Sequence, residues 1–145
     1  MFGPAGRLYC YFTYGMHWCA NVVCGADGVA AAVLLRAGVV VAGVPAARSR
    51  RPAAKKDVDL ARGPARLASC LGLGASTNGL DLLDPDSPVQ LGGVTRRAPR
   101  GLVTGPRVGI SSATERAWRF WLAGEPTVSA YKAGTRAPRP TRPAD

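Results

Sequence analysis

The sequence RLYCYFTYGMHWCANVV at residues 7–23 predicts a β-hairpin, around which the rest of the chain is organised. Residues 8–13 and 17–23 each alternate between two sets of side chains, which is the period of two that a β-strand imposes on its faces. Residues 14–16 lie between these predicted strands. Gly15 can adopt the positive φ angle that a short hairpin turn often needs.

Two side chains are unusual for a hairpin with only a structural role. Tyr14 is a large aromatic residue at a turn, where Asn, Asp or Gly is the usual choice. Asn21 is an amide on a predicted strand rich in apolar residues, so it must be hydrogen-bonded if it is buried. On pattern alone, both also fit a core hairpin with one exposed Tyr and one satisfied Asn.

The length, composition and charge of the chain limit its fold class and its kind of partner. A chain of 145 residues is long enough for one domain with a core, and its 18 Gly and 12 Pro favour a β-rich α+β fold with many turns. The 19 basic residues outnumber nine acidic ones, giving a net charge of +10. This charge favours a polyanionic partner, but by itself it does not separate DNA from RNA or an acidic membrane, or from a basic surface that aids solubility.

The cysteines do not predict a metal site. Cys10, Cys19, Cys24 and Cys70 have no CxxC spacing and are accompanied by one His, so we expect no metal and interpret Cys10 and Cys19 as small buried hydrophobic residues. No charged-then-apolar signal segment opens the chain, and its longest apolar run is shorter than a membrane span. We therefore expect a soluble, cytoplasmic protein that has no membrane contact.

Further elements follow the hairpin. An apolar stretch ending at Arg36 predicts a buried strand, and on pattern alone Arg36 is either a strand end that reaches solvent or a charge directed into a polar pocket. Pro64 and Gly72 bracket a predicted short helix. The buried strand that ends at Arg36 covers residues 29–36. The other predicted elements are strands at residues 39–41, 89–91 and 119–122 and a helical turn at residues 112–118.

A strongly basic segment covers residues 48–56 and is predicted to be a loop. It is interpreted as a flexible surface loop, as a phosphate-contacting loop, or as both. Its candidate phosphate contacts are Arg48, Arg50, Arg51, Lys55 and Lys56. The Pro- and Arg-rich residues 134–145 have little to bury and are predicted to be a disordered tail after a domain that covers residues 1–133.

Five segments together resemble the 3-methyladenine (alkyladenine) DNA glycosylase family and occur in the family's order. They are MFGPAGRLYCYFTYGMHWCANVV, AVLLRAG, LARGPARLASCLGL, GPRVGIS and RFWLAGEPTVS. The resemblance implies a single α+β domain with a curved, mainly antiparallel sheet or partial barrel and a few short helices. It also implies a monomeric enzyme that flips alkylated or deaminated purines out of double-stranded DNA and hydrolyses the bond between base and deoxyribose.

The resemblance also implies roles for individual residues. Tyr14 matches the tyrosine that intercalates into the duplex and fills the gap left by the flipped nucleotide, and Tyr11 matches the aromatic residue that stacks on the extruded base. Asn21 matches the residue whose side chain crowds the exocyclic amine of guanine. Arg36 and the backbone carbonyl of Val108 match ligands of the attacking water. His17 replaces an aromatic residue of some relatives and is expected to be structural.

One departure from the family pattern concerns catalysis. The family's general base is a Glu in a Glu-Thr-Glu-Ala-Tyr-type motif that precedes the MFGP segment, and no such motif occurs in these 145 residues. We therefore expect an N-terminally truncated family member, from a gene model that starts at an internal Met or from a broken gene. No cofactor is implied, because water is the nucleophile.

Two other functions are compatible with part of the sequence. The first is a binder that recognises damaged DNA without cleaving it. The second is a generic basic DNA- or RNA-binding domain. The ordered match at Tyr11, Tyr14, Asn21 and Arg36 argues against the second, because a generic binder does not need residues that select purines.

Overall fold

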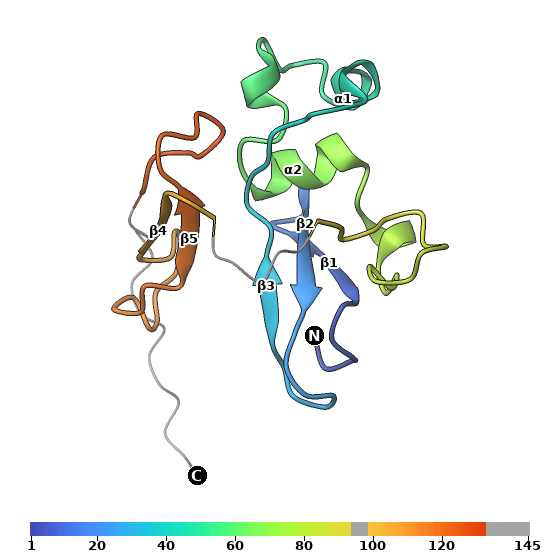
Figure 1. Ribbon diagram of the computed structural model, residues 1–145, viewed down its shortest axis with the longest axis vertical. Helices are drawn as coiled ribbons and strands as arrows, with labels where there is room; N and C mark the ends of the chain where they lie inside the picture. Colours follow the sequence, from blue (N-terminus) through green and yellow to red (C-terminus); the bar gives the residue numbers. More distant parts are fainter. Residues whose placement is uncertain (94–98, 133–145) are drawn as a thin grey trace. The chain divides into compact units, whose positions relative to one another are not determined.

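The part of the chain that the structure describes has an α+β fold with two antiparallel sheets and two short α-helices (Figure 1). The computed structural model describes residues 1–93 and 99–132. These residues form two compact units: unit 1 contains residues 1–93 and 126–128, and unit 2 contains residues 99–125 and 129–132. Within the described residues neither sheet closes into a barrel. The predicted tail at residues 134–145 lies outside the described residues.

The hairpin predicted from the sequence forms the centre of unit 1. Strand β1 (Leu8–Thr13) pairs antiparallel with β2 (His17–Val23), and β2 pairs antiparallel with β3 (Ala32–Leu34). The β1–β2 register is uninterrupted, so each residue of β1 has a partner on β2. Since directly paired residues share a face of the sheet, the register assigns every side chain to one of two faces.

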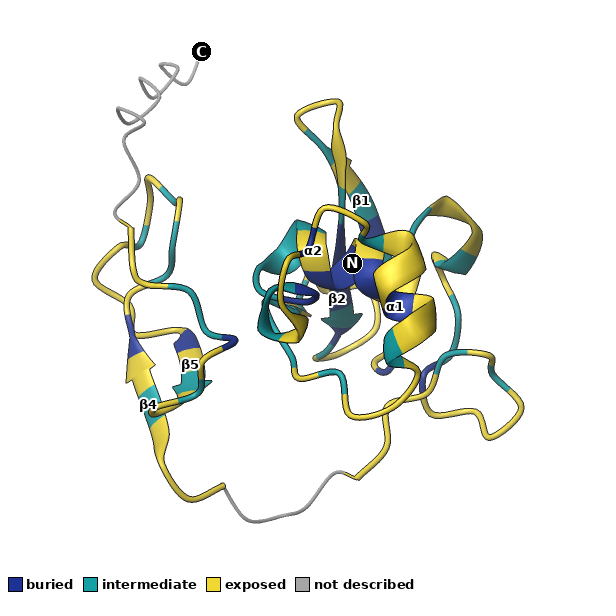
Figure 2. Cartoon of the chain, turned by 90° about the horizontal axis from the view of Figure 1, so that it is seen from above, coloured by how far each residue is buried: buried dark blue, intermediate teal, exposed yellow. Residues whose placement is uncertain are grey.

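One face of this sheet packs on helix α2 (Pro64–Leu71). The predicted start and end of this helix are confirmed: Pro64 lies in its first turn, and Gly72 ends it with φ 69°. Figure 2 shows buried positions on α2 and on the strands that it covers. The buried residues of this core are Leu8, Cys10, Ala20, Ala68, Leu73 and Leu82.

The outer edge of β1 is occupied by a later part of the chain. The Leu8 N–H donates to the Leu80 carbonyl at 2.8 Å, and the Gly79 N–H donates to the Leu8 carbonyl at 2.8 Å. The side chain of Asn78 continues this ladder, because its Oδ1 accepts from the Cys10 N–H at 2.9 Å. These bonds satisfy backbone groups of β1 that would otherwise be unpaired at a sheet edge, and they fix the hairpin in unit 1.

A second core of unit 1 lies between α2 and α1 (Val44–Arg50), together with the 3₁₀ turn η1 (Asp57–Asp59). A further 3₁₀ turn, η2 (Ala75–Thr77), precedes the segment that covers β1. The buried residues of the second core are Ala47, Ala54, Leu60, Ala61, Leu67 and Cys70. The predicted burial of cysteines is confirmed for Cys10 and Cys19, and Cys70 is buried as well.

Unit 2 is built on a two-stranded sheet. Strand β4 (Leu102–Gly105) pairs antiparallel with β5 (Arg119–Leu122), which confirms the strand predicted at residues 119–122. The prediction of a helical turn at residues 112–118 was wrong. These residues form bends and a turn in which Ala113 has φ 49°, and this left-handed conformation interrupts a right-handed helix.

Three other strand predictions need correction. The strand predicted at residues 29–36 is limited to Ala32–Leu34, because the Val29 N–H donates to the Ala26 carbonyl in the preceding turn. Residues 39–41 form no strand, and Val41 is 91% exposed. Residues 89–91 also form no strand: the Gln90 side chain bonds the Ser87 carbonyl in a local turn. Within the described residues, the segments at 39–41 and 89–91 do not join a strand ladder, and of the second only the Leu91 N–H bonds a distant carbonyl, that of Leu82, at 2.8 Å.

Candidate functional site

The second face of the hairpin, opposite the core, carries the residues predicted to select the base. The register pairs Tyr9 with Asn21 and Tyr11 with Cys19, so these four side chains share that face. Strand β3 extends it, because Leu34 pairs with Asn21 on the other side. The structure therefore brings Tyr11 and Asn21 together on one surface, which is distinct from the α2-covered face.

Asn21 is held in place by a cross-strand bond. Its side chain is 6% exposed, and its Nδ2 donates to the Tyr9 carbonyl at 3.0 Å. This bond gives the buried amide the hydrogen-bond partner that it needs. Because Nδ2 is engaged with the backbone, the bond fixes the plane of the amide and the direction of its oxygen. Asn21 is thus a fixed polar group on an otherwise aromatic and apolar face.

Tyr11 has an aromatic neighbour that the sequence did not single out. The rings of Tyr9 and Tyr11 are stacked, with centroids 5.8 Å apart and planes inclined by 27°. Burial raises the pKa of the Tyr11 hydroxyl above its ordinary value, and the adjacent Cys19 thiol raises it further. Tyr11 therefore remains a neutral phenol at physiological pH. The alternation of side chains along β1 could have identified Tyr9, because it lies two residues before Tyr11 and therefore on the same face of the strand.

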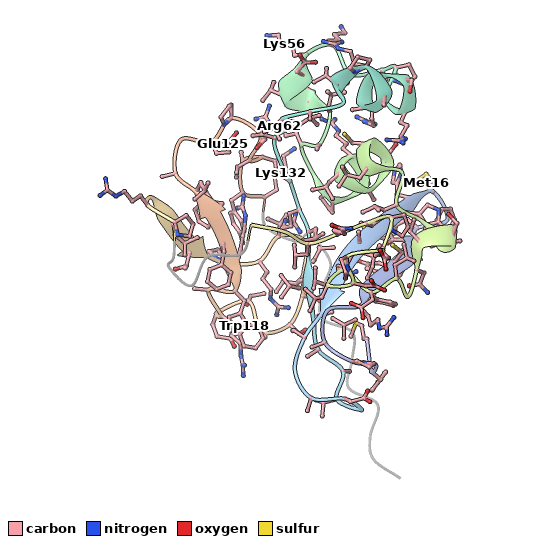
Figure 3. All side chains as sticks on the ribbon, turned by 45° about the vertical axis from the view of Figure 1, so that its right-hand side comes forward. Met16, Lys56, Arg62, Trp118, Glu125 and Lys132 are labelled. Atoms are coloured by element: carbon pink, nitrogen blue, oxygen red, sulfur yellow. The ribbon has the colours of Figure 1, made fainter. Side chains whose placement is uncertain are left out.

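The hairpin turn presents Tyr14 to solvent. Tyr14 is 79% exposed and has φ 51°, and the predicted positive φ of Gly15 is confirmed at 64°. The turn is closed by the Met16 N–H, which donates to the Thr13 carbonyl at 3.1 Å. Phe12 and Met16 are also exposed, and Figure 3 shows Met16 at this end of the hairpin. The tip is therefore an apolar projection on a short, hydrogen-bonded turn.

The two residues predicted to bind water lie in different units. Arg36 follows β3 in unit 1 and is half-buried, and the preceding Leu35 N–H still donates to the Ala20 carbonyl of β2. Val108 lies in unit 2, after β4. Because Arg36 and Val108 lie in different units, their shared role as ligands of the attacking water stays a prediction.

The basic segment is only partly a loop. Arg48 and Arg50 belong to α1, so the loop prediction for residues 48–56 was wrong over its first three residues. Arg48 forms an ion pair with Asp57 at 2.7 Å, and Arg50 donates to the Cys70 carbonyl at 3.2 Å. The helix forms because Pro45 opens it and the buried Ala47 anchors it against the second core.

The five predicted phosphate contacts therefore differ in availability. Lys55 and Lys56 are exposed, and among the described residues no ion pair involves them. Figure 3 shows Lys56 at the surface of unit 1. Arg51 is half-buried, and its Nε has no hydrogen-bond partner within the described part of the chain. Of the five candidates, Lys55 and Lys56 are therefore the two that are both exposed and without an ion pair among the described residues.

No carboxylate lies on the strands that carry the candidate site: β1, β2 and β3 contain neither Asp nor Glu. Several acidic side chains of unit 1 are in ion pairs elsewhere, including Asp57 with Arg48, Asp59 with Arg62 and Asp81 with Arg7. Across residues 1–93 and 99–132, no cluster of His, Cys, Asp or Glu is arranged to bind a metal ion. Nor does that part of the chain contain a helix of the length and apolarity needed to cross a membrane.

The sequence of this chain matches a known family along most of its length. The family described as "Methylpurine-DNA glycosylase" matches residues 1–126. The chain belongs to this family. The resemblance inferred from the hairpin and the four later segments is thereby confirmed.

Several bacterial members named "Putative 3-methyladenine DNA glycosylase" are similar to this chain. The Mycobacterium leprae protein (strain Br4923) is 54% identical over 140 residues, which are 97% of this chain and 64% of that protein. The Mycolicibacterium paratuberculosis protein is 53% identical, over 97% of this chain and 67% of that protein. The Nocardia farcinica protein is 52% identical, over 95% of this chain and 65% of that protein. The chain thus spans about two thirds of the length of these relatives.

Proposed function

We propose that this chain carries the damage-recognition surface of a base-excision DNA glycosylase that acts on alkylated or deaminated purines. The observation that supports this most directly is the hairpin: its two strands carry a fixed amide and a stacked tyrosine pair, and the turn between them carries an exposed tyrosine. Family membership supports the same class of reaction. The partner is double-stranded DNA with one damaged purine, bound by a monomer in the cytoplasm, which is associated with the nucleoid if the organism is bacterial.

In this proposal the two ends of the hairpin have different roles. Tyr14 enters the base stack and fills the space of the flipped nucleotide, which requires an exposed and conformationally restricted aromatic group. Tyr11 stacks on the flipped base, and its neutral ring presents a π-face to an electron-poor alkylated purine. Asn21 discriminates against guanine by a clash with the exocyclic amine, which is effective because the amide cannot rotate away without losing its bond to Tyr9.

Hydrolysis needs an attacking water and a base that accepts its proton. We assign the water ligands to the Arg36 guanidinium and the Val108 carbonyl, as the family resemblance implies. The general base is a carboxylate from the Glu-Thr-Glu-Ala-Tyr-type segment, which this sequence lacks. We expect the short sheet of unit 1 to be part of the curved, mainly antiparallel sheet that the family resemblance implies.

A non-catalytic binder of damaged DNA is the second candidate function. It is favoured by one observation, the absence of Asp and Glu from β1, β2 and β3. Such a protein would use the same Tyr11, Tyr14 and Asn21 to recognise the lesion. The two candidates therefore share the recognition surface and differ only in whether a base is released.

Lesion-selective binding tests the recognition surface itself. The 145-residue chain is expected to bind a duplex with one inosine several-fold more tightly than the matched undamaged duplex, because a weakly paired base is less costly to flip. Fluorescence anisotropy with labelled duplexes of equal length measures both affinities. Equal affinity for the two duplexes would remove the basis for assigning Tyr11, Tyr14 and Asn21 to damage recognition.

The basic residues are expected to make duplex binding sensitive to salt. Replacing both Lys55 and Lys56 with Gln should make the slope of log affinity against log salt concentration shallower by about two, at ~0.9 per phosphate contact. Anisotropy titrations between low and moderate salt measure this slope. Arg48→Gln is the matched control: Arg48 is already paired with Asp57, so its loss should change the slope less. An unchanged slope in the double variant would assign the contacts to other residues.

A further inference from the structure

The two-stranded sheet of unit 2 has one face that is open to solvent. The register pairs Leu102 with Leu122 and Thr104 with Phe120, so these four side chains lie on one face. All four are exposed, and Phe120 is 60% exposed. Soluble proteins rarely leave a large aromatic residue and two leucines together on an open sheet face unless the face binds something.

The opposite face of this sheet serves the packing of unit 2. It carries Arg119, which is buried, lies over the Trp121 ring at 4.8 Å and donates to the Ser129 carbonyl at 2.7 Å. The Arg119 guanidinium is therefore engaged by contacts within unit 2. The exposed face is therefore the one available to a ligand.

A tryptophan flanked by two arginines lies where the chain enters β5. Trp118 is 56% exposed, and the guanidinium carbons of Arg116 and Arg107 lie 4.5 and 5.4 Å from its ring centroid. Figure 3 shows Trp118 at this edge of unit 2. Phe120 follows two residues later on the exposed face of β5, so two large exposed aromatic side chains lie two residues apart in the chain.

Within the described residues of unit 2, the positive charge around Trp118 is only partly balanced. Arg107 donates to the carbonyls of Ser112 and Ala113, which carry no formal charge, and its Nε is buried without a partner among the described residues. Arg116 has a distant, exposed contact with Glu115 at 3.6 Å. The described part of unit 2 contains five basic residues and two acidic ones, so an anion would be attracted to this end of the sheet.

We propose that Trp118 and Phe120, together with Arg107 and Arg116, form a binding platform for an unpaired DNA strand. Exposed aromatic rings on a sheet stack with bases of any sequence, and adjacent guanidinium groups neutralise the phosphates between those bases. A single strand satisfies both features at once, because it offers flat π-faces and negative charges at alternating positions. A protein partner would need apolar side chains for the sheet face and carboxylates placed to meet both arginines.

This platform is separate from the hairpin and does not depend on the function proposed for it. It would let the protein hold an unpaired segment of DNA, such as a gap or a loop. Unpaired bases need no further unstacking from a partner strand, so the platform needs no intercalating residue of its own.

The experiment measures binding of the full 145-residue chain to fluorescein-labelled oligo(dT) of 12 nucleotides. Trp118→Ala is expected to weaken this binding about tenfold, the loss typical of one stacked base, and Phe120→Ala should also weaken it. Trp118→Phe should retain most of the affinity, because the ring is kept. Tyr131→Ala is the matched control, since it removes an exposed aromatic residue of unit 2 outside the sheet. Far-UV circular dichroism of each variant checks its fold.

Duplex binding provides the contrast that separates the two proposals. Tyr14→Ala should leave oligo(dT) binding unchanged while it weakens binding to a damaged duplex. Oligo(dT) binding that is insensitive to Trp118→Ala in a folded variant would overturn the platform, whatever the result for the hairpin. Tighter binding to oligo(rU) would overturn the assignment to DNA. Concentration-dependent self-association that is lost in Phe120→Ala, with oligo(dT) binding unchanged, would identify the face as a protein interface instead.

Discussion

The 145-residue chain is expected to release no hypoxanthine above background from an inosine-containing duplex. The reason is that the sequence lacks the family motif that supplies the general-base Glu, and β1, β2 and β3, which carry Tyr11 and Asn21, contain no carboxylate that could replace it. A positioned general base typically contributes about 10²–10⁴-fold to a rate. Arg36 cannot substitute for it, because a guanidinium group has only hydrogen-bond donors and no acceptor for the proton.

Single-turnover assays with excess protein measure this release, and alkaline cleavage of the product strand reveals each abasic site. A duplex partly depurinated with acid confirms that the cleavage step would report an abasic site. Anisotropy under the same conditions confirms that the duplex is bound, so that absence of release is not absence of binding. Clear excision by this chain would show that the missing Glu is not required and would rule out a purely non-catalytic binder.

The hairpin of β1 and β2 is the part of the molecule that could be predicted most fully from sequence. Its strands, turn and register follow from local rules, namely a period of two on each side and a glycine at the turn. The same holds for α2, whose ends are marked by Pro64 and Gly72. In these segments the local signals and the packing agree.

Predictions failed where a long-range partner decides the structure. Residues 39–41 and 89–91 have strand-like composition, but a strand exists only when another strand supplies its hydrogen bonds. Conversely, the segment at residues 78–80 has no strand pattern, yet it occupies the edge of β1 through Leu80, Gly79 and the Asn78 side chain. No local rule identifies that partnership, because Asn78 lies 68 residues from Cys10.

The candidate site was predictable in its members but not in its geometry. The family resemblance named Tyr11 and Asn21, and strand alternation alone could have added Tyr9. The bond from Asn21 to the Tyr9 carbonyl depends on the register across the hairpin. The partial neutralisation of the basic segment depends on α1, which brings Arg48 beside Asp57 and Arg50 beside Cys70.

Replacing Tyr14 with Gly is expected to weaken binding to a damaged duplex by at least about tenfold, since the intercalating group offsets unstacking that costs a few kcal/mol per step. The same change should leave the free energy of unfolding nearly unchanged. Tyr14 is 79% exposed and has φ 51°, so it contributes little packing and is held in a conformation that is unfavourable for a residue with a side chain. Glycine relieves that strain, which offsets the greater entropy of its unfolded chain.

This pair of results would distinguish a functional tyrosine from a structural one. Denaturant unfolding measures the stability of both proteins, and anisotropy with inosine-containing and undamaged duplexes measures their binding. Tyr14→Phe is the matched control, because it keeps the ring and should retain the preference for the damaged duplex. A Tyr14→Gly protein that is clearly less stable but binds the damaged duplex normally would assign Tyr14 to the fold. A protein that is equally stable and has lost its selectivity would show that the strained aromatic tip is retained for contact with DNA.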